Sequence, residues 1–435
     1  MLFGNRTEKR LAQQAENGAL DQSYRALVWR QFRKNRLAVW SLRALYVLLF
    51  VALFADFLAN DKPLYCRIEG KTYFPVFKQY AVNLGWSTWT GVLANADWHT
   101  LQYEAVVFPP IPYAATYLDR KNMSYVGPGA EQNVSSWRFR HWLGTDGLGR
   151  DVLAGMIAGT RVAMLVGVVS MAIATVIGIF FGAIAGYFGD DRLKISRIRL
   201  ILNVLGLVIG IFYGFTVRSY QYAEGNFSTE LFKSLAIIIG VLLLSNFLAT
   251  LLKRLAPLGK KLTIPADLLI MRFIEILNSI PALLLILSVV AVIRKPSILY
   301  VMAIIGLVRW TGIARFIRAE LLKIRSMNYV EAARAMGFSD WRIIVKHALP
   351  NALTSVLIAI AFGVASSILL EAFLSFLGVG MAAEQVTWGQ MLNAARTRFS
   401  AWWLALFPGL AIFLTVTIFN LLGEGLSDAL DPKRK

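Results

Sequence analysis

Cysteine, histidine and acidic residues are all scarce in this chain of 435 residues. The single cysteine, Cys66, excludes a disulfide framework within the chain, and the three histidines lie too far apart in the sequence to suggest a local metal motif. Charged residues make up only 16% and hydrophobic residues 57%, which argues against disorder and against soluble domains of ordinary composition. The net charge of +19 therefore indicates membrane topology rather than binding to nucleic acid.

Eight apolar segments are long enough to cross a bilayer core about 30 Å thick. They cover residues 39–58, 162–187, 199–217, 234–252, 268–293, 298–314, 351–378 and 401–423. The first follows a polar and basic stretch and has no small-residue cleavage site after it, so we expect it to remain as an anchor. The sequence thus predicts an all-α, polytopic membrane protein with eight transmembrane helices.

Lys and Arg are divided unequally between the two sides of these spans. With the N-terminus inside, the inner segments hold 28 of them and the short outer connections hold 6. Because basic residues are retained on the cytoplasmic side, we expect both termini inside. Residues 21–37 place apolar residues at helical spacing among five basic ones, which predicts a basic amphipathic helix on the inner surface, with a solvated arm as the alternative.

Residues 59–140 have a different character, with six prolines and scattered aromatic residues. This composition predicts a small, folded, non-helical insert on the extracytoplasmic side. Residues 141–151 follow it and hold three glycines within six positions, which predicts a tight turn against the mouth of the next span. The residues that we single out in this glycine turn are Gly144, Asp146, Gly149, Arg150 and Asp151.

The most informative stretch lies between the sixth and seventh spans, at residues 326–350. Asn328 is placed to cap a short helix, and Glu331, three residues on, to reach back to it. Gly337 supplies the left-handed residue that would stop this helix. The small residues that we expect to form a surface for another protein's groove are Ala332, Ala333 and Ala335.

A second short helix is expected after the glycine. Ser339 is placed to cap it, and it must yield near Pro350, where the chain turns into the seventh span. The order of residues across both helices resembles the cytoplasmic coupling loop of ATP-binding-cassette importer permeases. The matching positions are Glu331, Ala332, Ala333, Gly337, Leu349 and Pro350. Hereafter residues 326–350 are called the coupling loop.

Two further stretches, residues 143–152 and 407–432, are similar to the C-type permease subunit of dipeptide, oligopeptide and nickel importers. His347 stands where the general coupling pattern has Ile, a variation associated with the peptide branch. The resemblance covers residues 21–58, 141–189 and 264–435. It implies a six-span permease core into which two extra spans are inserted.

The resemblance also implies the partners and the chemistry. A B-type permease, two ATPase subunits and an extracytoplasmic binding protein are expected, in the cytoplasmic (inner) membrane of a bacterium. ATP and Mg would be bound by the ATPase subunits, with no cofactor or metal held by this chain and contact only with lipid and protein, not nucleic acid. The expected cargo is a di- or oligopeptide, with nickel, an opine or a peptide-conjugated antibiotic left open.

On this interpretation the chain divides into seven segments. Two of them are inserts to which the sequence assigns no function. The segments are a cytoplasmic basic arm at 1–38, an anchor at 39–58, an extracytoplasmic insert at 59–140, the start of the core at 141–189, a two-span insertion at 190–263, the core with the coupling loop at 264–427, and a cytoplasmic tail at 428–435.

Charged residues near membrane depth are candidates for the transport pathway. They are Arg272 and Glu275 near the inner end of the fifth span, Asn278 on the same face, and Glu371 toward the outer end of the seventh. An equally weighted alternative makes the first two an interfacial ion pair and brings Glu371 to the outer headgroups or a turn cap.

Two rival functions remain at this point. His141 and Asp146 have the spacing of a membrane acyltransferase motif, although both fall in or beside the glycine turn. A secondary transporter working without ATP is the other alternative.

Overall fold

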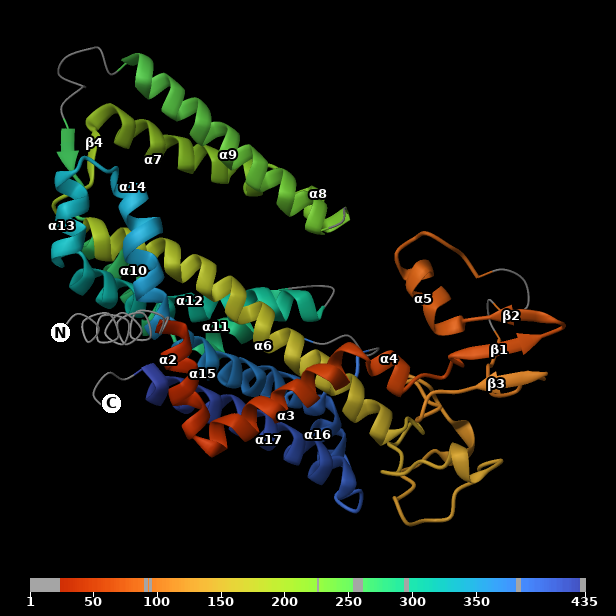
Figure 1. The fold of residues 1–435 in the computed structure, drawn as a ribbon. Helices are drawn as coiled ribbons and strands as arrows, with labels where there is room; N and C mark the ends of the chain where they lie inside the picture. The colour runs from red at the N-terminus through yellow and green to blue at the C-terminus, as the bar shows by residue number, and fades with distance from the viewer. Residues whose placement is uncertain are drawn as a thin grey trace, which may run out of the picture.

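Long helices run side by side in one bundle, and each end of the bundle carries a folded segment (Figure 1). The computed structural model describes residues 24–89, 93, 96–224, 227–252, 261–292, 297–380 and 385–430. The segment 59–151, hereafter the outer segment, lies at one pole, which we name the outer pole after the orientation expected from the sequence. The coupling-loop helices lie at the other, hereafter the inner pole, with α2 (Tyr24–Lys34) and the end of α17 (Trp403–Leu430). The remaining parts of the expected arm and tail, 1–23 and 431–435, lie outside the described residues.

The core of the bundle is built from helices of both halves of the chain. They are α3 (Arg36–Leu53), α6 (Val152–Ala183, continued by a π-helical turn at Ile184–Phe188), α10 (Ala266–Ser279), α11 (Ala282–Val292), α12 (Ile298–Ile324), α15 (Leu349–Phe376), α16 (Trp388–Thr397) and α17. Among the described residues, seven helices are long and apolar enough to cross a membrane, and the number is eight if the bent pair α10 and α11 counts as one span. The predicted all-α, polytopic membrane protein is therefore confirmed.

The fifth predicted span, 268–293, is not one continuous helix as its apolar pattern suggested. The chain bends by 77° between α10 and α11. Pro281 follows the break, and Ile280 before it is extended, with φ −93° and ψ 126°. Proline removes a backbone N–H and disfavours the helical conformation of the residue before it, which accounts for the bend.

The contact between α6 and α12 brings two backbones close together. A Cβ atom on Gly178 would lie 2.6 Å from the Cβ of Ile313, and one on Gly182 would lie 2.6 Å from the carbonyl oxygen of Ala314. Glycines spaced four apart form the small-residue seam that packs membrane helices. The side chain of Ile317 is fully buried against this seam.

Two arginines tie neighbouring helices to the core. Near the outer pole, Arg161 of α6 donates from Nη1 to Asp56 of α4 (Ala55–Leu58) at 2.9 Å. The same side chain donates from Nε to the Ala52 carbonyl at the end of α3, at 2.9 Å. At the inner pole, Arg318 of α12 donates from Nη2 to Oδ2 of Asp267 on α10 at 2.6 Å.

The outer segment contains a small antiparallel sheet of order β2–β1–β3. Its strands are β1 (Tyr65–Ile68), β2 (Lys71–Tyr73) and β3 (Ala105–Val107), accompanied by α5 (Pro75–Asn83) and two 3₁₀ turns, η2 (Arg120–Asn122) and η3 (Trp137–Phe139). The expectation of a non-helical insert was wrong for α5. Cys66 is fully buried in this sheet, and burial, which disfavours the thiolate, raises its pKa to about 11.

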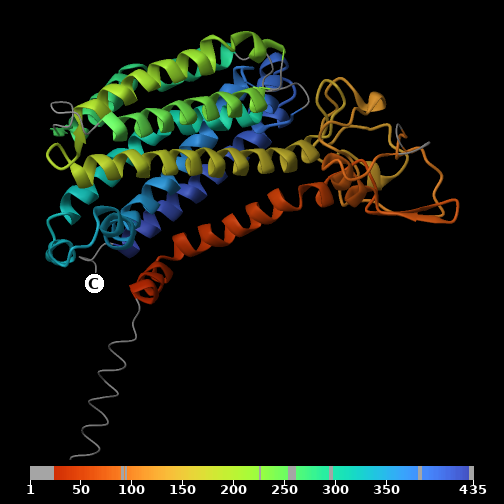
Figure 2. The ribbon, with the colours of Figure 1, turned by 90° about the horizontal axis from the view of Figure 1, so that it is seen from above.

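The segment that we predicted to be a two-span insertion forms a helical pair at the edge of the bundle, on the side away from α3 (Figures 1 and 2). Its elements are β4 (Lys194–Ser196), α7 (Arg197–Ile211, continued by a π-helical turn at Phe212–Thr216), α8 (Ser219–Glu224), α9 (Phe227–Leu252) and β5 (Lys261–Thr263). Asn246 of α9 donates to Asn203 of α7 at 2.9 Å, and β4 pairs with β5. Hydrogen bonds thus join the two helices and the two strands at their base to each other.

Candidate functional site

The first coupling helix is α13 (Asn328–Ala335). Its N-cap is Met327, which makes no side-chain hydrogen bond, so the prediction that Asn328 caps the helix was wrong. Gly337 ends the helix as predicted, with φ +79°. Its N–H donates to the Arg334 carbonyl at 2.9 Å and the next N–H donates to the Ala333 carbonyl at 3.2 Å, the paired bonds of a Schellman motif.

The second coupling helix begins at α14 (Asp340–Ile343). The Ser339 hydroxyl accepts a hydrogen bond from the Arg342 N–H at 3.4 Å, so this predicted cap is confirmed. The helix does not yield at Pro350. A π-helical turn at Ile344–Ala348 leads directly into α15, which starts at Leu349 and has Pro350 in its first turn. Proline is tolerated there because the first turn of an α-helix needs no N–H from it.

The coupling loop has two chemically different faces. Its exposed face includes Glu331, Ala332, Ala335, Met336 and Trp341, and the two large side chains among them are 66% and 68% exposed. Its other face is anchored in the apolar core by Val330, Ala333, Ile343, Ile344 and Ala348. The expectation that Ala333 belongs to the surface for a partner was therefore wrong, because this residue packs inward.

His347 lies between these faces, half-buried. Its ring stacks on that of Phe338, with 6.2 Å between centroids and 5° between planes. The Arg342 guanidinium, on the same second coupling helix as His347, lies 4.7 Å from the Phe338 ring centroid. The aromatic residue after Gly337 thus joins the turn to the second coupling helix.

At the opposite pole, the glycine turn is closed by its own carboxylates. Asp146 accepts hydrogen bonds from the Leu148 and Arg150 N–H groups, both at 2.9 Å, and its other oxygen accepts from Arg150 Nε at 2.7 Å. Gly144 and Gly149 have φ +80° and +81°. A Cβ atom on Gly144 would clash with the carbonyl oxygen of Val126, and one on Gly149 with that of Asp119. The turn therefore requires glycine at both positions.

Asp151 connects this turn to the first long helix of the core. Its Oδ1 accepts from the Ala154 N–H at 2.7 Å and so caps α6. Its Oδ2 lies 2.8 Å from Nδ1 of His141, and Nε2 of the same ring lies 3.1 Å from Asp119. His141 is fully buried and stacks on Tyr113, with centroids 4.3 Å apart.

This network shifts the pKa of two of its members. Burial alone would lower the pKa of His141, but the hydrogen bonds and charges of Asp151 and Asp119 outweigh burial and raise it. Burial would raise the pKa of Asp119, whereas its hydrogen bonds with Asn122 and His141 lower it. The arrangement therefore favours an imidazolium between two carboxylates.

The same geometry gives no support to an acyltransferase site. His141 is bonded to Asp151 and Asp119 rather than to Asp146, which pairs with Arg150. Both ring nitrogens are occupied and the side chain is shielded from solvent. A general base needs an accessible nitrogen within reach of its substrate, which this histidine does not offer. Among the described residues, no group of three or more His, Cys, Asp or Glu could hold a metal ion.

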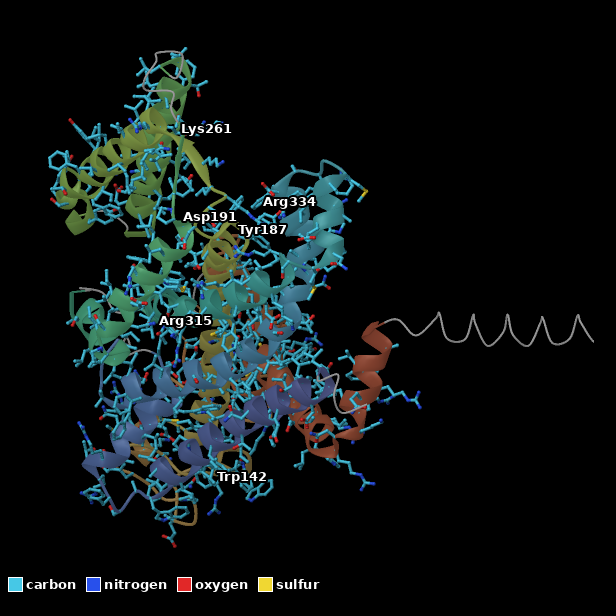
Figure 3. The ribbon with its side chains drawn as sticks, turned by 90° about the vertical axis from the view of Figure 1, so that its left-hand side faces the viewer. Trp142, Tyr187, Asp191, Lys261, Arg315 and Arg334 are labelled. Atoms are coloured by element: carbon cyan, nitrogen blue, oxygen red, sulfur yellow. The ribbon has the colours of Figure 1, made fainter. Side chains whose placement is uncertain are left out.

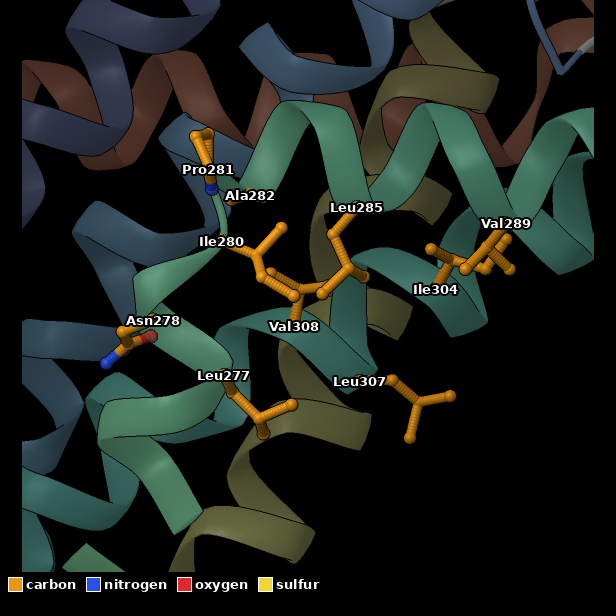
Figure 4. Close-up of a pocket in the computed structure, with 10 residues that line it drawn as sticks. All are labelled: Leu277, Asn278, Ile280, Pro281, Ala282, Leu285, Val289, Ile304, Leu307 and Val308. Carbon is orange, nitrogen blue, oxygen red and sulfur yellow. The ribbon is translucent and has the colours of Figure 1, made fainter. Parts of the chain in front are cut away.

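The pathway candidates near the inner half of the bundle lie on α10. Arg272 and Glu275 form an ion pair at 2.6 Å on an exposed face, with 69% and 60% of their side chains exposed. Asn278 accepts from the Thr311 hydroxyl at 3.3 Å and lines an apolar cavity of about 270 Å³ beside the bend at Pro281 (Figure 4). An exposed ion pair is compatible with both predicted roles of Arg272 and Glu275, lining the transport pathway or pairing at the membrane interface.

Glu371 belongs to a different environment. It is only 2% exposed, so the alternative that brings it to the outer headgroups was wrong. Ser375, one turn on, donates to its Oε1 at 2.6 Å. Gly389 of α16 packs directly on this part of α15. Glu371 is thus enclosed between two helices, away from the exposed Arg272 and Glu275 pair.

Sequence reasoning missed three residues that hold the site together: Arg161, Arg318 and Tyr187. The first two are charged residues in or next to predicted spans, and the rule that such charges are functional would have found them. Tyr187, at the inner end of α6, is fully buried and contacts both coupling helices. No local pattern marks it, because its partners lie about 150 residues further along the chain.

We expect His141→Ala to destabilise the outer segment by about 3–5 kcal/mol, because the buried carboxylate of Asp151 and the half-buried carboxylate of Asp119 lose their common partner. The raised pKa means that the stabilisation by imidazolium is complete below about pH 6.5 and is lost as pH rises through the folded-state pKa. Asp119, whose pKa is lowered, stays ionised throughout that range. Limited proteolysis of the full chain in detergent, at pH 6 and pH 9, measures both effects.

His347→Ala, at the opposite pole, is the control and should leave cleavage within 59–151 unchanged. A His141→Ala protein with wild-type resistance at both pH values would contradict the role of this network.

Comparison with known proteins gives a consistent result. Residues 256–435 match the family model described as the binding-protein-dependent transport system inner membrane component. Residues 23–74 match the N-terminal TM domain of oligopeptide transport permease C.

Three relatives illustrate the similarity. The chain is 29% identical over 415 residues to the inner membrane ABC transporter permease protein YejE of Escherichia coli, covering 93% of this chain and 96% of that protein. It is 32% identical over 296 residues to the glutathione transport system permease protein GsiD of Pectobacterium atrosepticum, covering 68% and 73%. It is 30% identical over 295 residues to the dipeptide transport system permease protein DppC of Bacillus subtilis, covering 67% and 69%. With its multiple spans and this similarity, the chain belongs to the inner-membrane permeases of binding-protein-dependent ABC import systems, and is a transporter subunit rather than an enzyme.

Proposed function

We propose that this permease moves peptides across the cytoplasmic membrane and that its coupling loop receives movement from separate ATPase subunits. The cargo is supported by relatives whose names specify glutathione, dipeptide and oligopeptide transport. The coupling role is supported by the two-faced loop, which exposes Glu331, Met336 and Trp341 while its other side is anchored in the core. A B-type permease, two ATPases that bind ATP and Mg, and an extracytoplasmic binding protein complete the proposed assembly.

The mechanism follows from how the loop is attached. It continues directly from α12 and into α15, so a displacement of α13 by an ATPase moves both helices. ATP binding and hydrolysis in the ATPases would thereby shift the bundle between outward- and inward-open states, as expected for a rocking transporter. Glu331, in the first turn of α13, complements the positive end of that helix and presents a carboxylate to the partner.

The proposed orientation puts the coupling-loop pole in the cytoplasm. The two ends of the described chain, α2 and the end of α17, pack together at this pole. The segment 59–151 then faces outward, where a binding protein can reach it. This agrees with the excess of Lys and Arg assigned to the inner segments.

The first prediction concerns the cargo. In membrane vesicles containing the whole importer, labelled di- or oligopeptide should accumulate only when ATP and the binding protein are both supplied, and vanadate should stop it. Uptake that persists without ATP would favour a secondary transporter. Uptake of nickel or an opine with no peptide uptake would overturn the peptide proposal.

The second prediction concerns coupling. Gly337→Val forces a β-branched residue into φ +79°, and Glu331→Lys reverses a charge on the exposed face. Each should lower uptake roughly 5- to 150-fold, the range of a coupling free energy of about 1–3 kcal/mol, while the subunit still inserts. Uptake and binding-protein-stimulated ATP hydrolysis are measured in the same vesicles.

Matched controls exist for both variants. Gly240→Val places the same side chain where nothing lies within 4 Å of a Cβ, and Asp191→Lys reverses an exposed carboxylate on the same side but outside the loop. Unchanged uptake and unchanged ATPase stimulation in both loop variants would defeat the coupling assignment.

The third prediction concerns orientation. In a Cys66→Ala background, Phe399→Cys should react with a membrane-impermeant maleimide in intact cells, because the native residue is 89% exposed at the outer pole. Met336→Cys, at a position 66% exposed in the coupling loop, should react only after the membrane is opened. The reverse pattern would mean that the chain is inserted the other way round.

A further inference from the structure

The inner end of α6 lies beneath the coupling loop, although it is remote from the loop in sequence. The helix runs through residues 152–188, with its last turn in the wider π-helical form at Ile184–Phe188. Tyr187 lies in that turn and is 0% exposed. Figure 3, seen from this pole, shows Tyr187 at the end of α6 with Arg334 of α13 close beside it.

One phenol hydroxyl joins the two coupling helices. It donates to Oδ1 of Asp340, the first residue of α14, at 2.7 Å. It accepts from Nη2 of Arg334, near the end of α13, at 3.2 Å. The Arg334 guanidinium also lies 5.7 Å from the Tyr187 ring centroid, within range of a cation–π contact. Both hydrogen bonds involve a charged group, the stronger kind.

The position of Tyr187 is fixed by the core. A Cβ atom on Gly186, the preceding residue, would lie 2.7 Å from the Arg318 carbonyl oxygen, so α6 is in direct backbone contact with α12 at this level. The Tyr187 ring belongs to the same buried apolar cluster as Ile324, the last residue of α12. The hydroxyl therefore projects from a rigid base rather than from a mobile end.

The covalent chain attaches the loop to α12 and α15 but not to α6. Asp340 follows Tyr187 by 153 positions. Apart from apolar packing of the anchored face, the Tyr187 hydroxyl is the polar connection between α6 and both loop helices in the part of the chain that the structure describes. At its other end, α6 is capped by Asp151 and held by His141, so the helix connects the outer segment with the coupling loop.

We propose that Tyr187 is a positioning residue that couples α6 to the loop, so that movement of α13 and α14 is transmitted to α6 as well as to α12 and α15. This rests on the proposed function of the coupling loop and adds a specific joint to it. Without the hydroxyl, the ATPases still bind the loop and hydrolyse ATP, but less of the movement of α13 and α14 is transmitted to α6. The signature is ATP consumption without matching transport.

The test is Tyr187→Phe in the complete importer. Phenylalanine keeps the ring, its packing and the Arg334 contact, and removes only the hydrogen-bonding hydroxyl. We expect binding-protein-stimulated ATP hydrolysis close to wild type and about fivefold more ATP hydrolysed per cargo molecule taken up. Tyr213→Phe is the matched control, because Tyr213 also lies in a π-helical turn at the end of a long helix but is 54% exposed.

A variant of Asp340 distinguishes the loss of this one hydrogen bond from a general packing defect. Asp340→Leu removes the acceptor of the same hydrogen bond, so the double variant with Tyr187→Phe should be no worse than the more affected single variant. Asp340→Asn, which keeps a carbonyl oxygen as acceptor, should recover much of the coupling ratio. A wild-type ratio for Tyr187→Phe, or single effects that multiply in the double variant, would overturn the proposal.

Hydrogen exchange gives a readout that needs no cargo. In the complete chain, Tyr187→Phe should increase amide exchange in residues 328–343, while Tyr213→Phe should not. Unchanged amide exchange of residues 328–343 in Tyr187→Phe would overturn the proposed role of Tyr187, whatever cargo the importer carries. A wild-type importer that takes up no peptide in response to ATP would instead refute the proposed function, and the two failures are thus distinguishable.

Discussion

Gly178, Gly182 and Gly186 let the backbone of α6 lie directly against α12, and the other core helices are arranged around that contact. Lipid tails are as apolar as leucine, so burial of apolar surface drives helix association in a membrane only weakly. Close van der Waals packing and hydrogen bonds must supply the specificity instead. A side chain at any of these three positions would separate the two helices and shift everything that packs on them.

The two ends of α6 are held by different chemistry. At the outer end, a carboxylate caps the helix and shares a buried imidazole with a second carboxylate, which fixes the insert to the core. At the inner end, a buried phenol bridges a guanidinium and a carboxylate of the coupling loop. A buried polar or charged group is stable only with such partners, and each network therefore sets one geometry. One helix of 37 residues, about 55 Å long, spans the distance between them.

The helical pair of α7 and α9 lies beside this framework rather than within it. α7 and α9 pack on each other through small and polar residues, including the bond between Asn203 and Asn246. Among the described residues, a short ribbon of β4 and β5 connects the pair to the inner pole. Because two spans return the chain to the side from which it left, the coupling loop keeps its side of the membrane.

The sequence by itself determined the features that depend on local composition and backbone conformation. The long apolar helices, the helix stop at Gly337, the cap at Ser339 and the tight glycine turn all follow from apolar length, positive φ or a neighbouring hydroxyl. The local signals failed where several outcomes share one pattern: Asn328 looked like a cap, and an apolar run hid the bend at Pro281.

Only the tertiary structure decided which distant groups meet. His141 pairs with Asp151 and Asp119 instead of Asp146, Glu371 is enclosed rather than at the surface, and Tyr187 reaches a loop 153 positions away. A side chain's partners depend on how helices are placed in space, and that placement is set by backbone contacts between segments far apart in the chain. Periodicity and spacing report on one segment at a time, so they carry no information about such contacts.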